Sequence, residues 1–373
     1  MRPLLVDLET AWRGGQNQAL LLLDGLRARG HEPELLAAQG SALGERATAS
    51  GIPVHYAPRG FFQIPAALAV RRLVSSGAFD LVHANEAHAV SAAWLARAHC
   101  RVPFIISRRV GYPISRSRIA RSRYEAAAQI VANSQWVADQ AAASGAPRKK
   151  LTVVFEGAEI PPRLVPEQRL AARRRWQQAD GAPLLGCVGI LSPDKGQEWL
   201  IRGVAELRSE FPGLRLLLAG DGPCRSQLQA LAQSLNISDR VLFAGFIKDV
   251  ESVYAALDVF LLPSFFEALN NSLLAAMTYE IPSIAFRRGA LPEIIEHAAS
   301  GLLVDAADLS QLTAAIRRLL RDHAFSATLG RAGRLRVETA FSADRMVEGM
   351  IRVYEECLSR LAQPVSRGGN AAL

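Results

Sequence analysis

The chain has 373 residues, and half of them are hydrophobic. This length and composition predict a packed globular protein of two domains and exclude a disordered chain. The four cysteines, at positions 100, 187, 224 and 357, lie far apart without a C-x-x-C pair, so we expect buried thiols in a reducing compartment and no disulfide framework or zinc site. No apolar run approaches the roughly 18 residues of a membrane span, and acidic residues within the first ten argue against a signal peptide. We therefore expect a soluble, cytoplasmic protein.

The positive charge of the chain is concentrated in its first half. Residues 1–160 hold 19 Lys and Arg against 12 Asp and Glu, a net charge of +7, whereas residues 161–373 hold 24 against 23, a net charge of +1. This asymmetry favours an acidic partner for the first half, such as an anionic membrane surface, a phosphorylated acceptor or nucleic acid. An Arg-rich composition that reflects a GC-rich coding sequence is the alternative explanation.

The first half opens with an apolar strand at residues 4–8, the glycines of Arg13-Gly14-Gly15, and a helix from about Gln16 to Arg29 that ends before Gly30. The glycine pair allows a ligand or a facing domain to approach the backbone, although a plain tight turn explains it equally well. The pattern is not G-x-G-x-x-G, so it predicts no dinucleotide site.

Strands and helices then alternate along the first half. Further strands are expected at residues 34–37, 54–56, 81–83, 104–106, 130–132 and 152–155, with helical patterns at 64–74, 89–98 and 136–143. Such alternation predicts a doubly wound parallel sheet that is covered by helices on both faces.

Polar side chains gather where two of these strands end. His83, Asn85, Glu86 and His88 follow one strand, and Ser107, Arg108 and Arg109 follow the next. Polar groups at the carboxyl edge of a sheet are what a binding site requires, although strand ends are polar in any fold. We take His88, Arg108 and Arg109 as candidate site residues, and His83 as a residue that burial could equally explain.

The segment 111–124 interleaves basic residues with aromatic and aliphatic ones. Its arginines stand at positions 116, 118, 121 and 123, near Tyr112, Ile114, Ile119 and Tyr124. Such a segment can lie on a phospholipid surface, but at about 1 kcal/mol for each arginine it supports only reversible, peripheral contact. Nucleic acid is the rival partner, yet no recognised binding motif accompanies the charge, so we expect none.

The second half begins after a change in composition. Residues 161–183 are rich in proline and arginine and predict a linker followed by the first helix of a second domain. Strands are expected at residues 184–189, 214–219, 241–244, 259–262, 283–286 and 302–304, separated by helices. The layer pattern repeats that of the first half, which predicts two doubly wound domains with a cleft between them. The expected boundaries are 1–162, 163–342, a final helix at 343–362 that packs back on the first domain, and a disordered tail at 363–373.

The stretch 257–277 brings a carboxylate to the edge of the second sheet. The strand Val259–Leu262 ends at Pro263, and a helical pattern opens on Asn270-Asn271, which are good N-cap residues. Glu267 therefore lies between the carboxyl end of a strand and a helix N-terminus, where ligands bind in open α/β sheets. Carboxylate, amide and hydroxyl groups there suit a ligand with sugar hydroxyls and phosphate, unless Glu267 merely complements the helix dipole.

Several motifs of the second half occur in a fixed order. They are Gly189-Ile-Leu-Ser-Pro-Asp-Lys195-Gly196, Ala219-Gly220-Asp221-Gly222-Pro223, Gly245-Phe246, PSFFEALNNSLLAAM at residues 263–277, and Gly289-Ala-Leu-Pro292-Glu293. Together they resemble the motifs of the retaining GT-B glycosyltransferases of the GT4 family. The first half agrees in its R-G-G loop, its A-R-G-H helix end, its F-D-L-V-H segment and its A-N-S…L-T-V-V segment, so that the resemblance covers residues 1–360.

This resemblance implies two Rossmann-like domains that face a cleft. It also implies transfer of a sugar from a UDP- or GDP-sugar to a cell-envelope glycan or lipid-linked acceptor, such as the lipopolysaccharide core. The transfer would retain the anomeric configuration. Lys195 would contact the donor diphosphate, the helix beginning at Asn270-Asn271 would offer N–H groups to the distal phosphate, and Glu267 would hold hydroxyls of the transferred sugar. A cation and a helix dipole aimed at the leaving diphosphate stabilise the transition state more than the ground state, so no metal or cofactor is expected.

By the same resemblance Glu267 and Lys195 are the catalytic candidates. From its composition and its basic segment 111–124, we expect the protein to act in the cytoplasm, with peripheral contact at the inner face of the membrane. The acceptor-side candidates are His88, Arg108 and Arg109. The donor-binding candidates are Gly14, Gly15, Gly189, Lys195, Gly220, Gly222, Glu267, Asn270, Asn271 and Ser272.

The sequence also departs from the family pattern. Ile190 replaces a phosphate-binding arginine of the family pattern. The pattern also has a second glutamate eight residues after Glu267, which usually accepts hydrogen bonds from the ribose, and Ala275 stands at that position. Glu280 stands where a glycine is usual, and Ser107-Arg108-Arg109 stands where a histidine is often found. Losing one charge-assisted contact costs roughly 1.5–3 kcal/mol, which weakens donor binding without abolishing the mechanism. A non-catalytic, donor-impaired scaffold protein and a nucleotide-sugar epimerase on the same fold are the alternative hypotheses.

Overall fold

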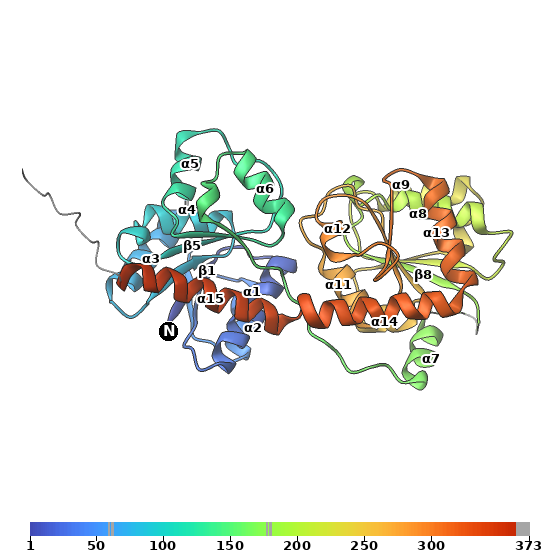
Figure 1. Ribbon diagram of the computed structural model, residues 1–373, viewed down its shortest axis with the longest axis horizontal. Coiled ribbons are helices and arrows are strands. Elements are labelled where there is room, and N and C mark those ends of the chain that lie inside the picture. The colour runs from blue at the N-terminus through green and yellow to red at the C-terminus, as the bar shows by residue number, and fades with distance from the viewer. Residues whose placement is uncertain (59, 61–62, 177, 179–180, 363–373) are drawn as a thin grey trace, which may run out of the picture. The chain divides into compact units, whose positions relative to one another are not determined.

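The computed structural model describes residues 1–58, 60, 63–176, 178 and 181–362, which fold into two α/β units (Figure 1). Unit 1 comprises residues 1–133, 137–154 and the chain from Ala343 onward, and unit 2 comprises residues 134–136 and 155–342. The expected disordered tail at 363–373 lies outside the described residues. Within them, every helix is too short or too polar to cross a lipid bilayer.

Unit 1 is built on a parallel sheet whose strands, as far as the chain is described, follow the order β3-β2-β1-β4-β5-β6-β7. The strands are β1 (Pro3–Asp7), β2 (Glu34–Ala38), β3 (Val54–Ala57), β4 (Leu81–Ala84), β5 (Phe104–Arg108), β6 (Gln129–Ala132) and β7 (Leu151–Val153). The chain runs from β1 outward to β3 and then returns to β4 on the other side of β1. The pair β1–β4 is therefore the topological switch point of this sheet.

Helices cover both faces of this sheet. They are α1 (Gly14–Ala28), α2 (Ala42–Ala49), α3 (Ile64–Ser75), α4 (Ala87–Leu95), α5 (Arg118–Glu125), α6 (Gln135–Ala143) and α15 (Ala343–Ala362), with short 3-10 turns η2 (Ala98–Cys100) and η3 (Arg148–Lys150). Figure 1 shows α4, α5 and α6 on one side of the sheet and α1 and α2 on the other. The final helix α15 packs beside α1, where Val347 fills the space that a side chain at Gly25 would occupy.

Unit 2 repeats the same design, and its described strands follow the order β10-β9-β8-β11-β12-β13, all parallel. They are β8 (Leu184–Val188), β9 (Arg215–Ala219), β10 (Val241–Gly245), β11 (Val259–Leu262), β12 (Ser283–Phe286) and β13 (Leu302–Val304). The helices are α7 (Pro166–Arg175), α8 (Gln197–Leu207), α9 (Arg225–Ser234), α10 (Glu251–Ala256), α11 (Asn271–Thr278), α12 (Leu291–Ile294), α13 (Leu309–Arg321) and α14 (His323–Ala340), with 3-10 turns η4 (Pro193–Lys195) and η5 (Ser238–Arg240). The switch point here is the pair β8–β11.

The cores explain why these apolar runs are strands. In β9, Leu216 and Leu218 pack with α8, α9 and α13, whereas Leu217 and Ala219 pack with α10 and α11 on the other face. Successive side chains of a strand point to opposite faces, so a strand that is covered on both faces is apolar throughout. The predicted fold class, a doubly wound α/β architecture in both halves, is confirmed.

Some local expectations are wrong. Ser107 and Arg108 are the last residues of β5 and do not follow it, and β7 ends at Val153 rather than at position 155. Of the four cysteines, all of which are described and free of disulfides, three are buried, but Cys100 is exposed because it lies in the 3-10 turn η2 at the surface. The helix α5 follows the cap of Ser117, and among its residues Tyr124 alone is buried.

Candidate functional site

The loops that follow β8 and β11 carry the two catalytic candidates. Because β8 connects outward to β9 and β11 connects to β12 on the other side, these loops leave the sheet edge in opposite directions. Ligands bind at such a switch point in open α/β sheets. Lys195 ends the turn η4 after β8, and Glu267 lies in the loop after β11.

Lys195 and Glu267 are in direct contact. Lys195 Nζ lies 2.6 Å from Glu267 Oε1, and the side chains are 21% and 7% exposed. The same Oε1 atom accepts a hydrogen bond of 3.0 Å from Asn270 Nδ2. Asn270 also caps α11, because its Oδ1 accepts from the backbone N–H of Leu273 at 2.8 Å. The carboxylate, the ammonium group and the start of the helix thus form one constellation.

Glycines hold the two loops together. Gly196 has φ +65°, and a Cβ there would lie 2.3 Å from the carbonyl oxygen of Pro263, while Phe265 N donates to Asp194 O at 2.8 Å. Gly289 has φ +55°, and a Cβ there would lie 2.1 Å from the carbonyl oxygen of Glu267. Only glycine combines this conformation with so close an approach, so these positions fix the backbone that presents Lys195 and Glu267.

The other donor-side candidates of unit 2 line the same edge. A Cβ at Gly220 would lie 1.9 Å from Gly189 O, and one at Gly222 would lie 2.4 Å from Leu191 O, so the turns after β8 and β9 are in close contact. Asn271 and Ser272 form the first turn of α11. The structure therefore brings Gly189, Gly220 and Gly222 together at one edge.

Two of the departures from the family pattern lie at this edge. Ile190 is 54% exposed in the loop after β8, where a large apolar side chain gains nothing from the protein core. Ala275 is half-buried in α11. Glu280, in contrast, lies beyond the opposite end of α11 and pairs with Arg163 at 2.8 Å. It therefore does not replace the carboxylate missing at position 275.

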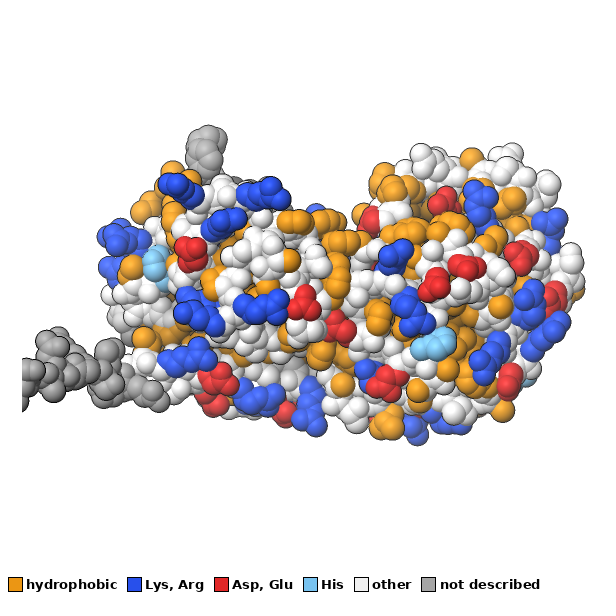
Figure 2. Space-filling view, turned by 45° about the horizontal axis from the view of Figure 1, so that its top comes forward, with side chains coloured by type: hydrophobic (Ala, Val, Ile, Leu, Met, Phe, Trp, Pro, Cys, Tyr) orange, Lys and Arg blue, Asp and Glu red, His pale blue; other side chains and the backbone are white. Residues whose placement is uncertain are grey.

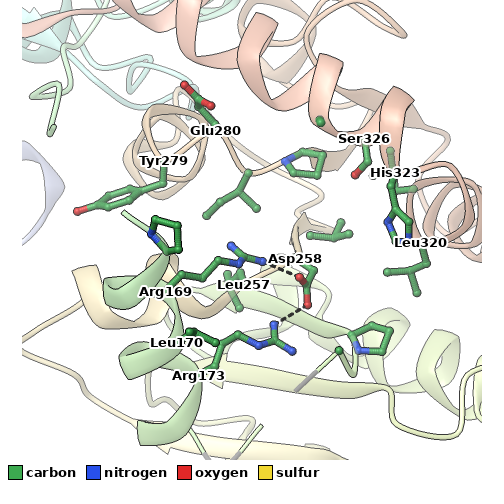
Figure 3. Close-up of a pocket in the computed structure, with 18 residues that line it drawn as sticks. Arg169, Leu170, Arg173, Leu257, Asp258, Tyr279, Glu280, Leu320, His323 and Ser326 are labelled. Carbon is green, nitrogen blue, oxygen red and sulfur yellow. Dashed lines mark hydrogen bonds and ion pairs between the residues drawn. The ribbon is translucent and has the colours of Figure 1, made fainter. Parts of the chain in front are cut away.

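A surface pocket of about 570 Å³ lies at the amino edge of this sheet, away from Lys195 and Glu267 (Figure 3). Glu280 and Tyr279 stand on its rim. Inside it, Asp258 pairs with Arg169 at 2.6 Å and with Arg173 at 2.9 Å. These charges satisfy one another and hold α7 on the unit, so we assign the pocket a structural role.

Unit 1 has its own polar edge at the switch point of β1 and β4. Gly14 and Gly15 begin α1, and no described side chain caps that helix. Arg109 Nη1 donates to Asn85 Oδ1 at 2.6 Å and to Asn85 O at 2.8 Å. His88 is exposed in the first turn of α4 and contacts Gln63 at 3.2 Å.

The other polar residues expected at this edge point elsewhere. Arg108 turns away from the edge, donating to the Tyr124 hydroxyl at 3.0 Å and to the carbonyl of Tyr112. His83 is buried, with Tyr354 and Ser107 hydroxyls each 2.7 Å from a ring nitrogen, and burial lowers its pKa to about 3. It is therefore a neutral core residue.

Sequence reasoning missed the acidic residue Asp7 at this edge, and it placed Glu86 there without taking it as a candidate. Asp7 is fully buried at the end of β1 and accepts from Asn85 Nδ2 at 2.6 Å, Gln16 Nε2 at 3.0 Å and Glu9 N at 3.1 Å. Burial raises its pKa, and these hydrogen bonds oppose the rise. Glu86 caps α4, and burial raises its pKa too. The carboxylate within the apolar run Leu4-Leu-Val-Asp7 was the available signal.

As far as the chain is described, no three His, Cys, Asp or Glu side chains gather where they could hold a metal ion. The carboxyl edge of the unit 2 sheet presents the ammonium group of Lys195 and the N-terminus of α11, and a helix start favours negative charge. This arrangement can bind a phosphate-bearing ligand next to a buried carboxylate that accepts hydroxyl hydrogen bonds.

Comparison with known proteins agrees with this chemistry. Residues 12–160 match the family described as Glycosyltransferase Family 4, and residues 182–322 match Glycosyl transferases group 1. The crystal structure of Anabaena HepE in complex with UDP superimposes with a TM-score of 0.83 at 21% identity, covering 95% of this chain and 100% of that one. The fold is thus that of the GT-B glycosyltransferases.

Curated relatives place the chain within a family. A D-inositol 3-phosphate glycosyltransferase of Nocardia farcinica is 31% identical over 309 residues, which are 76% of this chain and 67% of the relative. A GDP-mannose-dependent phosphatidylinositol monomannoside mannosyltransferase of Mycolicibacterium smegmatis is 33% identical over 178 residues, 45% of this chain. The chain spans 46% of that relative's length. The protein belongs to glycosyltransferase family 4, as the resemblance in its motifs predicted.

Proposed function

We propose that this protein transfers a hexose- or heptose-type sugar from a UDP- or GDP-sugar to a cell-envelope glycan or lipid-linked acceptor, with retention of anomeric configuration and without a metal or cofactor. The observation that carries the proposal is the contact of Lys195 with Glu267 beside the start of α11. The matching glycosyltransferase families and the glycosyltransferase names of the relatives support the reaction class.

The proposed roles follow from charge. A nucleoside diphosphate gains negative charge as the glycosidic bond breaks, and Lys195 with the N–H groups at the start of α11 would stabilise that charge. Glu267, buried and oriented by Asn270, would hold hydroxyls of the sugar in place. The acceptor hydroxyl would attack the face from which the diphosphate departs, within a short-lived ion pair, and would give its proton to the departing diphosphate. Attack from this face retains the configuration.

The acceptor side is proposed to lie in unit 1, at the edge that carries Gly14, Gly15, His88 and Arg109. The names of the Nocardia and Mycolicibacterium relatives describe enzymes of phosphorylated inositol compounds. A basic unit 1 and an arginine at its sheet edge support an acceptor that carries phosphate or lies at a membrane.

Reversible contact with an anionic membrane is a further part of the proposal. Tyr112 and Ile119 are 59% and 58% exposed, and Arg116, Arg118 and Arg121 around them are also exposed. Figure 2 shows basic side chains with apolar ones between them on the part of unit 1 where α5 lies in Figure 1. This composition supports peripheral binding at the cytoplasmic face.

The membrane proposal is tested by sedimentation with vesicles. Binding to vesicles that contain anionic phosphatidylglycerol, and not to phosphatidylcholine vesicles, is expected, with loss in a variant carrying Arg116→Glu, Arg118→Glu and Arg121→Glu. The matched control changes three exposed arginines elsewhere to glutamate: Arg202, Arg331 and Arg352. Equal loss in both variants would reduce the effect to net charge and contradict a specific surface on α5.

Transfer itself is tested with isotope-traced UDP- and GDP-sugars, purified protein and a membrane extract. Labelled product is expected in wild type, with the anomeric configuration of the donor and in the presence of EDTA, and it should form roughly 10- to 100-fold more slowly in Lys195→Ala or Glu267→Ala. No transfer, together with no affinity for any nucleotide or nucleotide-sugar, would favour the donor-impaired scaffold hypothesis, which Ile190 and Ala275 motivate. A free altered sugar formed without acceptor would identify an epimerase. Transfer at the wild-type rate in both variants would contradict the assigned roles.

A further inference from the structure

Three side chains at the carboxyl edge of the unit 1 sheet form a continuous chain of hydrogen bonds. Asn85 Nδ2 donates to Asp7 Oδ2 at 2.6 Å, and Asn85 Oδ1 accepts from Arg109 Nη1 at 2.6 Å. The backbone carbonyl of Asn85 accepts a second hydrogen bond from the same Nη1 at 2.8 Å. The three residues come from the ends of β1, β4 and β5, which are adjacent strands at the switch point.

The orientation of the Asn85 amide is determined by its two neighbours. An ionised carboxylate only accepts hydrogen bonds, and a guanidinium only donates them. The amide must therefore turn its NH₂ group to Asp7 and its oxygen to Arg109. The flipped orientation would place the NH₂ donor against the guanidinium donor and the amide oxygen against the carboxylate oxygen. Asp7 thus fixes Asn85, and Asn85 fixes the guanidinium of Arg109.

The chain of contacts runs from the core to the surface. Asp7 is 0% exposed and Asn85 is 3% exposed, whereas Arg109 is only half-buried at the sheet edge. A buried carboxylate needs hydrogen-bond donors or opposite charge to remain ionised, and this one receives them from Asn85 and Gln16.

Arg109 is held beside the glycine pair. A Cβ at Gly15 would lie 3.8 Å from Arg109 Cδ, so the stem of the arginine passes over the backbone at Gly15, at the start of α1. Asn85 Nδ2 also lies 3.4 Å from Gly15 O. The guanidinium therefore lies next to the two glycines that were candidates for close approach of a ligand.

We propose that Asp7 and Asn85 are positioning residues for Arg109, and that the guanidinium they hold binds a phosphoryl group of the ligand. A planar guanidinium matches phosphate oxygens in geometry and charge, and holding it in place reduces the entropy lost on binding. The proposal rests on the proposed function, which supplies two sources of phosphoryl groups: the nucleoside diphosphate of the donor and a phosphorylated acceptor.

Calorimetric titration of the full chain separates these sources. The probes are UDP and GDP for the donor, and D-inositol 3-phosphate with unphosphorylated inositol as its blank for the acceptor. The KM and kcat for transfer to a membrane extract form a third measurement. Arg109→Ala is expected to weaken one class of probe, or raise the KM for the acceptor, by roughly tenfold, which is the lower end for a hydrogen bond to a charged group.

A double-mutant cycle tests whether Asn85 acts through Arg109. Asn85→Ala should weaken the same probe in the same direction, and the double variant Asn85→Ala/Arg109→Ala should match Arg109→Ala alone. Asn85→Asp keeps an oxygen for Arg109 but places a carboxylate against Asp7, so it should bind better than Asn85→Ala although its Tm is lower. If Asn85 has only a structural role, the less stable Asn85→Asp should bind the probe more weakly than Asn85→Ala.

Gln16→Ala provides the matched control, because Gln16 donates to the same Asp7 oxygen but has no described contact with Arg109. It should lower Tm and leave probe affinities within about twofold. Additive losses in the cycle, an equal loss in Gln16→Ala, or no loss in Arg109→Ala for any probe or for KM would overturn the proposal. If Lys195→Ala then still weakens nucleotide binding, the proposed function stands and the proposal for Arg109 fails. If wild type binds no probe and transfers no sugar, both fail.

Discussion

Lys195 Nζ and Glu267 Oε1 lie 2.6 Å apart although 72 residues separate them in the chain. The contact exists because β8 and β11 are neighbours at the switch point, so the loops that follow them start side by side. The pair keeps both side chains in fixed rotamers, and a ligand phosphate would have to share the ammonium group with the carboxylate. Preorganised charge of this kind is what stabilises a developing anion most effectively.

The first prediction concerns this pair. Lys195→Ala and Glu267→Ala should each lower kcat/KM for the nucleotide-sugar by roughly 10- to 100-fold, because each removes a hydrogen bond to a charged group worth about 1.5–3 kcal/mol. Steady-state kinetics with a labelled donor measures this. Glu280→Ala is the matched control, because that carboxylate pairs with Arg163 at the other end of α11 and should leave kcat/KM within about twofold. A control loss as large as that of Glu267→Ala would remove the distinction between the two ends of the helix.

A second prediction separates the two roles of Asn270, which caps α11 and orients Glu267. Asn270→Ala should lower the free energy of unfolding by about 1 kcal/mol, because the N–H of Leu273 loses its cap. Asn270→Ser can still cap the helix but cannot reach Glu267. It should therefore retain nearly wild-type stability in urea while its kcat/KM falls to the level of Asn270→Ala. If activity instead follows stability in both variants, Asn270 acts only as a cap.

The third prediction concerns Gly289, whose backbone lies against that of Glu267. An added Cβ would lie 2.1 Å from Glu267 O, so Gly289→Ala must move the loop. The substitution should lower the free energy of unfolding by more than about 2 kcal/mol and should also lower activity. Gly77 has a similar φ, +72°, with nothing within 4 Å, so Gly77→Ala shows the cost of the backbone conformation alone, about 1 kcal/mol. Thermal unfolding and kinetics of the two variants compare these costs. Equal losses of stability in Gly289→Ala and Gly77→Ala would mean that the Glu267 loop can move away from the added Cβ without a cost in stability.

The strands were predictable because parallel strands that are buried on both faces are continuous apolar runs, as in Val259–Leu262. The helix α5 has no such signal, since its only buried side chain is Tyr124, and its position depends on the fold of unit 1. Glu267 could be placed at a sheet edge from its own strand and helix. Its contact with Lys195 could not, because spacing does not specify that β8 and β11 are neighbours.

The relation of Asp7 to Asn85 was out of reach for the same reason, since it requires the strand order β1–β4. Arg108 and Arg109 show the limit from another side. Adjacent residues at the end of a strand point to opposite faces, so one arginine joins Asn85 and the other joins Tyr124. No sequence pattern distinguishes which of the two faces the site.

The fourth prediction is a pH dependence of stability caused by His83. Both ring nitrogens of this buried histidine are hydrogen-bonded to hydroxyls. Burial lowers its pKa to about 3 in the folded chain, from the ordinary value of 6.5 that applies in the unfolded chain. Above pH 6.5 the histidine is neutral in the folded and unfolded chains and contributes no pH dependence. Below it the unfolded chain takes up a proton that the folded chain refuses, so the folded state loses stability as the pH falls.

Urea unfolding of wild type and His83→Gln between pH 8 and pH 5 measures this effect. Relative to the variant, wild type should lose about 2 kcal/mol between pH 7 and pH 5, at about 1.4 kcal/mol for each pH unit below 6.5. Asp7 and Glu86, whose pKa values burial raises, change stability in the opposite direction, but they are present in both proteins and cancel in the difference. Between pH 7.5 and 8 the difference should be constant, which serves as the internal control. A difference that stays constant down to pH 5 would mean that His83 is protonated in the folded protein, against its burial between Tyr354 and Ser107.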